Sequence, residues 1–71
     1  MMAFTDKLRD ILRERKISTS KFSDETGISR KIFYDTGRTY HKATLMAIAY
    51  YLNTAVEDLI SGTDAEDSWY R

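Results

Sequence analysis

Two copies of one short pattern, eleven residues apart, constrain this chain more than any other feature. Each copy begins with Ile-Ser and has a Phe five residues after the Ile; the copies are Ile17, Ser18 and Phe22, then Ile28, Ser29 and Phe33. A Ser at this position accepts a hydrogen bond from the first turn of a helix, and the two apolar residues pack together across it. Gly27 and Gly37 follow the two copies, and glycine readily ends a helix in the left-handed conformation. The pattern therefore predicts two short helices joined by a tight turn at Gly27.

The rest of the chain also has helical periodicity. Apolar residues recur at spacings of three and four, and no strand-length stretch alternates strictly. We expect an all-α fold of five helices: about Thr5 to Arg15, 18–26, 29–36, Lys42 to Leu52, and a last helix that Thr54 caps and Gly62 ends. Thr54 and Glu57 have the spacing of a capping box.

The organisation we expect is one helix-turn-helix domain over residues 1–62, with its motif at about 18–37, followed by an acidic tail at 63–71. A chain of 71 residues is long enough for one small core. The tail has little reason to be ordered, and we predict that it is flexible. Its Trp69 and Tyr70 leave two further readings open, because these aromatic residues can also fold back on the first helix or anchor a partner.

Composition excludes several classes of site and location. With no Cys and one His, the chain cannot form a disulfide, a thiolate metal site or a multi-histidine metal site. We expect no metal and no cofactor. A nucleophile–base–orienter set is missing, so an enzyme is not expected, and His41 is read as a loop residue or helix cap. No apolar run approaches the roughly 20 residues of a membrane span, and the first residues lack the apolar core of a signal peptide. We therefore expect a cytoplasmic protein without a membrane partner.

Charge is unevenly distributed along the chain, although the net charge is zero. Residues 1–38 contain nine Lys and Arg against six Asp and Glu, whereas residues 39–71 contain two against five. Between Gly27 and Lys42 the balance is four cations to one anion. The basic charge is thus local to this segment, and the acidic tail cancels it in the total.

Two segments, TSKFSDETGISRKIFYDTG and TLMAIAYYLNTAVEDLI, resemble the helix-turn-helix domain of the Cro/repressor family of phage and bacterial regulators. The resemblance covers about residues 4–62. It implies a DNA-binding fold that presents its third helix to the major groove, and a small switch protein of a temperate phage that binds operator DNA as a dimer. The chain departs from the family in having Gly27 and Gly37 ten residues apart rather than twelve, Thr36 at an inward position, and Ile32 at a position that the family usually exposes.

The resemblance also implies roles for individual residues. Thr19, Ser20 and Lys21 would hold a phosphate at the start of the second helix. Ser29, Arg30 and Lys31 would meet base edges, with Tyr34 one turn later. Arg38, Thr39 and Lys42 would follow the DNA backbone.

A second function stays open on the same residues. Small helix-turn-helix proteins of phage lysis–lysogeny switches also act as antirepressors or modulators that bind the repressor itself and block its DNA binding. Net neutrality, the shortened third helix and the acidic tail suit a protein partner. That surface would consist of Arg30, Lys31, Ile32, Tyr34, Asp35 and Arg38.

Overall fold

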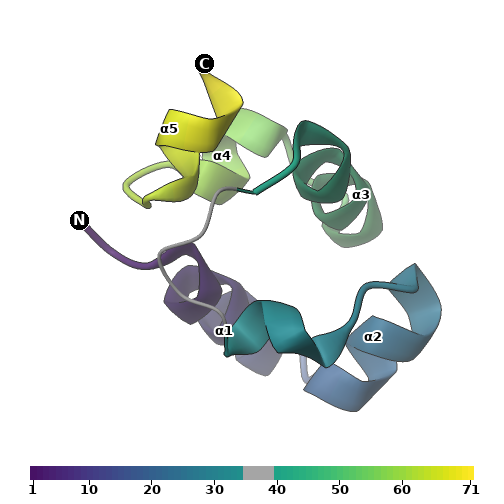
Figure 1. Cartoon of the computed structure of the whole chain (residues 1–71). Helices are drawn as coiled ribbons and strands as arrows, with labels where there is room; N and C mark the ends of the chain where they lie inside the picture. Colours follow the sequence, from purple (N-terminus) through teal and green to yellow (C-terminus); the bar gives the residue numbers. More distant parts are fainter. Residues whose placement is uncertain (35–39) are drawn as a thin grey trace.

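Five α-helices and one 3₁₀-helix make up a computed structural model of the protein, which describes residues 1–34 and 40–71 (Figure 1). In chain order they are α1 (Phe4–Glu14), α2 (Thr19–Thr26), η1 (Arg30–Phe33), α3 (Lys42–Leu52), α4 (Val56–Ile60) and α5 (Ala65–Trp69). No strand forms within the two described ranges, and the predicted all-α fold is confirmed. Figure 1 shows two halves, with α1, α2 and η1 in one and α3, α4 and α5 in the other.

The first half of the predicted motif forms as its sequence pattern indicates. Ser18 caps α2, and its Oγ accepts a hydrogen bond of 3.0 Å from the backbone N–H of Lys21. Phe22 is fully buried, and Ile17 packs against the same core. Gly27 ends the helix with a φ of +76°, in the left-handed region that glycine adopts without a Cβ penalty. Local capping chemistry therefore fixes both ends of α2.

The second half is shorter than predicted and has a different helical form. Ser29 accepts a hydrogen bond of 3.2 Å from the backbone N–H of Lys31, so the predicted cap is present. The segment then continues only to Phe33, as a 3₁₀-helix. The predicted end of this helix at Gly37 lies outside the described residues.

Ile32 corrects one prediction about the binding surface. We expected it to be exposed beside Arg30 and Lys31, but its side chain is only 5% exposed and belongs to the core. A 3₁₀-helix turns about 120° per residue, so Ile32 and Phe33 point in well-separated directions. Both directions are internal, because Phe33 packs towards α1 and α2 while Ile32 lies beside Tyr40 and the first turn of α3.

Aromatic rings connect the motif to the other half of the fold. Phe22 of α2 makes edge-to-face contacts with Phe33 of η1 and with Tyr51 of α3, each with ring centroids 5.6 Å apart. Such pairs contribute roughly 0.5–1.5 kcal/mol each beyond the area they bury. Phe22 therefore fixes α2, η1 and α3 relative to one another.

The segment after Gly62 also differs from its prediction. We expected a flexible tail, but residues 65–69 form α5, in which Ala65 and Ser68 are buried and Trp69 packs against the core. The backbone N–H of Tyr40 donates a hydrogen bond of 3.0 Å to the Ser68 hydroxyl. Trp69 thus folds back on the core, with its ring 5.9 Å from Lys42 Nζ at the start of α3, so the contact shown is with α3 and not the predicted one with the first helix; Tyr70 remains largely exposed.

The two ends of the described chain are tied together. Asp64 Oδ1 accepts a hydrogen bond of 2.9 Å from the backbone N–H of Phe4, the first residue of α1. An isolated bridge also pairs Met2 with Thr63. Ala3, which precedes α1, has no side-chain acceptor, so Asp64 supplies the cap from the far end of the chain. The predicted cap at Thr54 is wrong, since α4 begins after Ala55 and has no side-chain cap.

Candidate nucleic-acid interface

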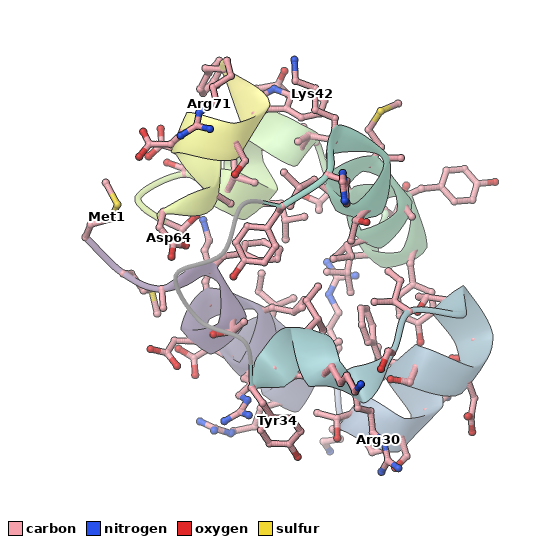
Figure 2. The ribbon with its side chains drawn as sticks, viewed as in Figure 1. Met1, Arg30, Tyr34, Lys42, Asp64 and Arg71 are labelled. Atoms are coloured by element: carbon pink, nitrogen blue, oxygen red, sulfur yellow. The ribbon has the colours of Figure 1, made fainter. Side chains whose placement is uncertain are left out.

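The start of α2 and the whole of η1 present their polar side chains on one side of the molecule. Arg30 Nη1 donates a hydrogen bond of 3.2 Å to Ser20 Oγ, which links the two elements across the turn. Figure 2 shows Arg30 and Tyr34 projecting from the same side of the molecule, away from its body. We call the exposed residues of this region the η1 surface; they are Ser20, Lys21, Ser29, Arg30, Lys31 and Tyr34.

Tyr34 and Arg9 form the end of the η1 surface nearest to α1. The Tyr34 side chain is 75% exposed. Arg9 of α1 lies beneath it, with its guanidinium carbon 5.8 Å from the centroid of the Tyr34 ring and 5.6 Å from that of Phe33. Arg9 Nη2 also donates a hydrogen bond of 3.1 Å to the backbone oxygen of Phe33. The guanidinium therefore holds the last residue of η1 while placing a positive charge beneath an exposed aromatic ring.

Sequence reasoning missed Arg9. Arg9 lies in the first predicted helix among charged residues at helical spacing, a pattern typical of a solvent face. Arg9 is in fact half-buried, and its guanidinium reaches η1. Its contact partner is 24 residues away in the sequence. No local pattern marks such a pair.

Two other residues that we predicted to contact DNA, Thr19 and Lys42, do not belong to the η1 surface. Thr19 is half-buried at the start of α2, beside Ile17 and Arg13. Lys42 lies at the opposite end of the molecule from Arg30 and Tyr34, next to Arg71 (Figure 2). Its Nζ donates a hydrogen bond of 3.2 Å to the backbone oxygen of Arg71 and lies 5.9 Å from the centroid of the Trp69 ring. The structure does not bring Lys42 together with the η1 surface.

Three further predicted residues lie outside the described part of the chain. They are Asp35, Arg38 and Thr39.

The η1 surface combines groups that suit an anionic partner. Lys21, Arg30 and Lys31 are exposed cations, and the free N–H groups of the first turn of α2 lie beside Ser20. A helix N-terminus binds phosphate through such N–H groups and its dipole. Within the described ranges, we find no cluster of three His, Asp or Glu side chains able to hold a metal ion. Nor is any described helix long and apolar enough to cross a membrane.

Comparison with known protein families agrees with this geometry. The family model of the Cro/C1-type helix-turn-helix DNA-binding domain matches residues 7–64, which is more than half of the chain. The chain belongs to this family. No curated protein and no solved structure was found to match the chain significantly.

The matched region of the Cro/C1-type domain runs from within α1 to Asp64. It contains α2, η1, α3 and α4, and it stops just before α5. The resemblance seen in the sequence is thereby confirmed at the level of the family. A domain of this type binds DNA, which indicates a transcriptional regulator.

Proposed function

We propose that this protein is a transcriptional regulator of a phage lysis–lysogeny type switch, which binds operator DNA through the η1 surface in the cytoplasm of a bacterial host. The observation that carries the proposal is the hydrogen bond between Arg30 and Ser20. It couples an Arg on η1 to the start of α2, where backbone N–H groups are free.

The two linked elements have complementary chemistry for a duplex. Ser20, Lys21 and the N-terminal turn of α2 suit a phosphate, and phosphate contacts position a protein without reading sequence. Arg30 and Lys31 suit the O6 and N7 acceptors of guanine in the major groove. Tyr34, exposed over Arg9, provides a ring and a hydroxyl one turn further on. One side of the domain thus supplies both positioning and base-reading groups.

Fluorescence anisotropy tests this proposal directly. The probe is a labelled duplex from the intergenic region beside the gene, and a duplex of scrambled sequence is the comparison. A good bidentate contact to a base contributes roughly 1–3 kcal/mol, so Arg30→Glu should weaken binding at least about fivefold. Arg71→Glu reverses the same charge at the far end of the molecule and should leave affinity nearly unchanged.

Two results would reject operator binding. One is equal affinity for the intergenic and scrambled duplexes at every salt concentration. The other is full binding by the Arg30→Glu variant. For the wild type, the association constant should also fall with salt concentration. Each tenfold rise in salt should lower its logarithm by about 0.9 for every phosphate that the protein neutralises.

The exposure of Tyr34 favours one alternative, an antirepressor that binds a partner phage repressor through the same surface. Tyr and Arg are over-represented among residues that dominate protein interfaces. Here Tyr34 is 75% exposed between Arg9 and the cations of η1. The burial of Ile32 removes one apolar residue from the surface that we expected for this partner. Arg30, Lys31 and Tyr34 would then contact carboxylates and apolar groups of the repressor.

Co-purification separates the alternative from DNA binding. The protein is expressed together with the repressor encoded beside it, and the complex is measured by size-exclusion chromatography at micromolar concentration. The antirepressor function predicts a complex that wild type forms and both Arg30→Glu and Tyr34→Ala lose. If wild type forms none, this alternative is wrong.

A further inference from the structure

The outer face of α3 is apolar and uncovered. Four of its residues, Ala43, Met46, Ala47 and Tyr50, are exposed at the i, i+3, i+4, i+7 spacing of one helix face. Tyr50 is 89% exposed and Met46 is 55% exposed. Residues 43–52 include no charged residue, although 31% of the whole chain is charged. We call these four residues the α3 face.

We propose that the α3 face is the surface through which two copies of this chain form a dimer, with their α3 helices antiparallel. The inference deepens the proposed function, because operator binding by a dimer would need such a surface.

The order of large and small residues on the α3 face supports a second copy as the occupant. A two-fold axis between Met46 and Ala47 places Ala43 opposite the partner's Tyr50 and Met46 opposite the partner's Ala47. Every large side chain then meets a small one, and alternating sizes allow two helices to approach closely. A parallel pair would place each large residue against its own copy. The face is therefore self-complementary in the antiparallel sense, as an interface between identical copies requires.

A hollow beside the α3 face offers room for the large side chains of the second copy. It has a volume of about 720 Å³ and is lined by the α3 face, by Tyr51 and by Glu25 and Thr26 at the end of α2. Tyr51 donates a hydrogen bond of 2.5 Å to a Glu25 carboxylate oxygen, which fixes one wall. Ala43 and Ala47 leave the space that the partner's Tyr50 and Met46 would fill.

The same arrangement orients both motifs correctly for DNA. The flank of α3 that carries Tyr51 contacts α2, whereas the flank that carries Lys42 contacts Trp69 of α5. In Figure 1, α2 and α5 accordingly lie on different sides of α3. The two-fold axis of the antiparallel dimer is perpendicular to both α3 helices. The Tyr51 flanks of both copies therefore lie on one side of the dimer, and the Lys42 flanks lie on the other. Both α2–η1 units then face one side, where a single duplex could contact both.

The expected dimer is weak, because the α3 face is small. An aromatic side chain buries roughly 150–250 Å², and the other three residues are smaller, so the total buried area falls in the range below about 1,200 Å² that is typical of transient pairs. We therefore expect a dissociation constant on the order of micromolar in the absence of DNA.

Sedimentation equilibrium of the full chain without DNA tests the dimer separately from operator binding. Ala47→Glu places two carboxylates next to the two-fold axis, and Tyr50→Ala removes the largest contact. Each should raise the dimer dissociation constant at least about tenfold. Tyr70→Ala removes an exposed tyrosine from outside the face and should change nothing. Circular dichroism verifies that each variant is folded.

Cysteine cross-linking tests the antiparallel arrangement, and it is clean because the chain has no Cys of its own. With a rise of 1.5 Å per residue, the two copies of position 47 would be about 1.5 Å apart along the helix axes, and those of position 43 about 10 Å apart. A disulfide needs Cα atoms within about 7 Å. Ala47→Cys should therefore cross-link under oxidation, and Ala43→Cys should not.

Three other results would contradict the proposed dimer. Cross-linking at both positions would indicate a parallel pair. A monomer at several hundred micromolar, or a dimer that Ala47→Glu leaves intact, would show that the α3 face does not pair with itself. Operator binding by a strictly monomeric protein would leave the proposed function standing and reject only this interface.

Discussion

Replacement of Arg9 by Ala should destabilise the domain although Arg9 lies outside the predicted motif. Its guanidinium donates a 3.1 Å hydrogen bond to the Phe33 oxygen and lies within 6 Å of two aromatic rings. A hydrogen bond from a charged group contributes roughly 1.5–3 kcal/mol, and a cation–π contact at an exposed site contributes roughly 0.5–1 kcal/mol. Because Arg9 is only half-buried, solvent screening reduces these contributions, and we expect a loss of about 1–2 kcal/mol in the free energy of unfolding, which is less than their sum.

Urea and thermal unfolding measure this loss. For a domain of this size, each kcal/mol lowers Tm by roughly 4–8 °C. Arg13→Ala is the matched control, because Arg13 lies one turn later on α1, is exposed, and pairs only loosely with Asp10 at 3.4 Å. It should change the free energy of unfolding by less than about 0.5 kcal/mol. Arg9→Lys keeps the positive charge but lacks the planar guanidinium group, so it should recover only part of the lost free energy of unfolding.

The same variant connects stability to function. If Arg9 holds the end of η1, Arg9→Ala should also weaken duplex binding, whereas Arg13→Ala should weaken it less. Equal stability of the Arg9→Ala and Arg13→Ala variants would refute the reasoning, because the contacts to Phe33 and Tyr34 would then contribute nothing.

Three further outcomes follow from single contacts. Asp64→Ala removes the side-chain cap of α1 and should lower the free energy of unfolding by about 1 kcal/mol in urea titrations, whereas Asp24→Ala, at an exposed position within α2, should not. Ser18→Ala removes the cap of α2 and should cost a similar amount, about 0.5–2 kcal/mol, measured as a shift in urea midpoint at unchanged slope. The hydrogen bond to Glu25 raises the pKa of Tyr51 above its ordinary value of 10.0, so its stabilising contribution is present below that pH and is lost as the pH rises through the raised pKa. The free energy of unfolding should fall above about pH 10, and Tyr51→Phe should reduce this fall.

The parts of the fold that could be predicted from sequence are those decided within one or two helical turns. Ser18, Gly27 and Ser29 act on backbone groups only a few residues away, so their types and spacing were sufficient. The bounds of α3 were predicted for a similar reason, because its apolar stripe is continuous.

The parts that could not be predicted depend on contacts between distant segments. Ile32 looked exposed because Phe33 already took the inward direction, but its side chain is buried in the core beside Tyr40. Arg9 looked like a solvated charge until its partner 24 residues away was known. The tail looked disordered because its composition is acidic, yet Asp64 reaches a helix start 60 residues earlier. Local patterns carry no signal for any of these three.

The hydrogen bond from Phe4 to Asp64 has a consequence for the order of events during synthesis. Helix α1 leaves the ribosome before the carboxylate that caps it, which is made 60 residues later. A loop of that length must close before the cap forms, and long-range closure is entropically costly. The nascent chain can form the short α2 early, since its cap is local. Helix α1 gains its full stability only after residue 64 has emerged, so the domain cannot complete its folding before that residue is made.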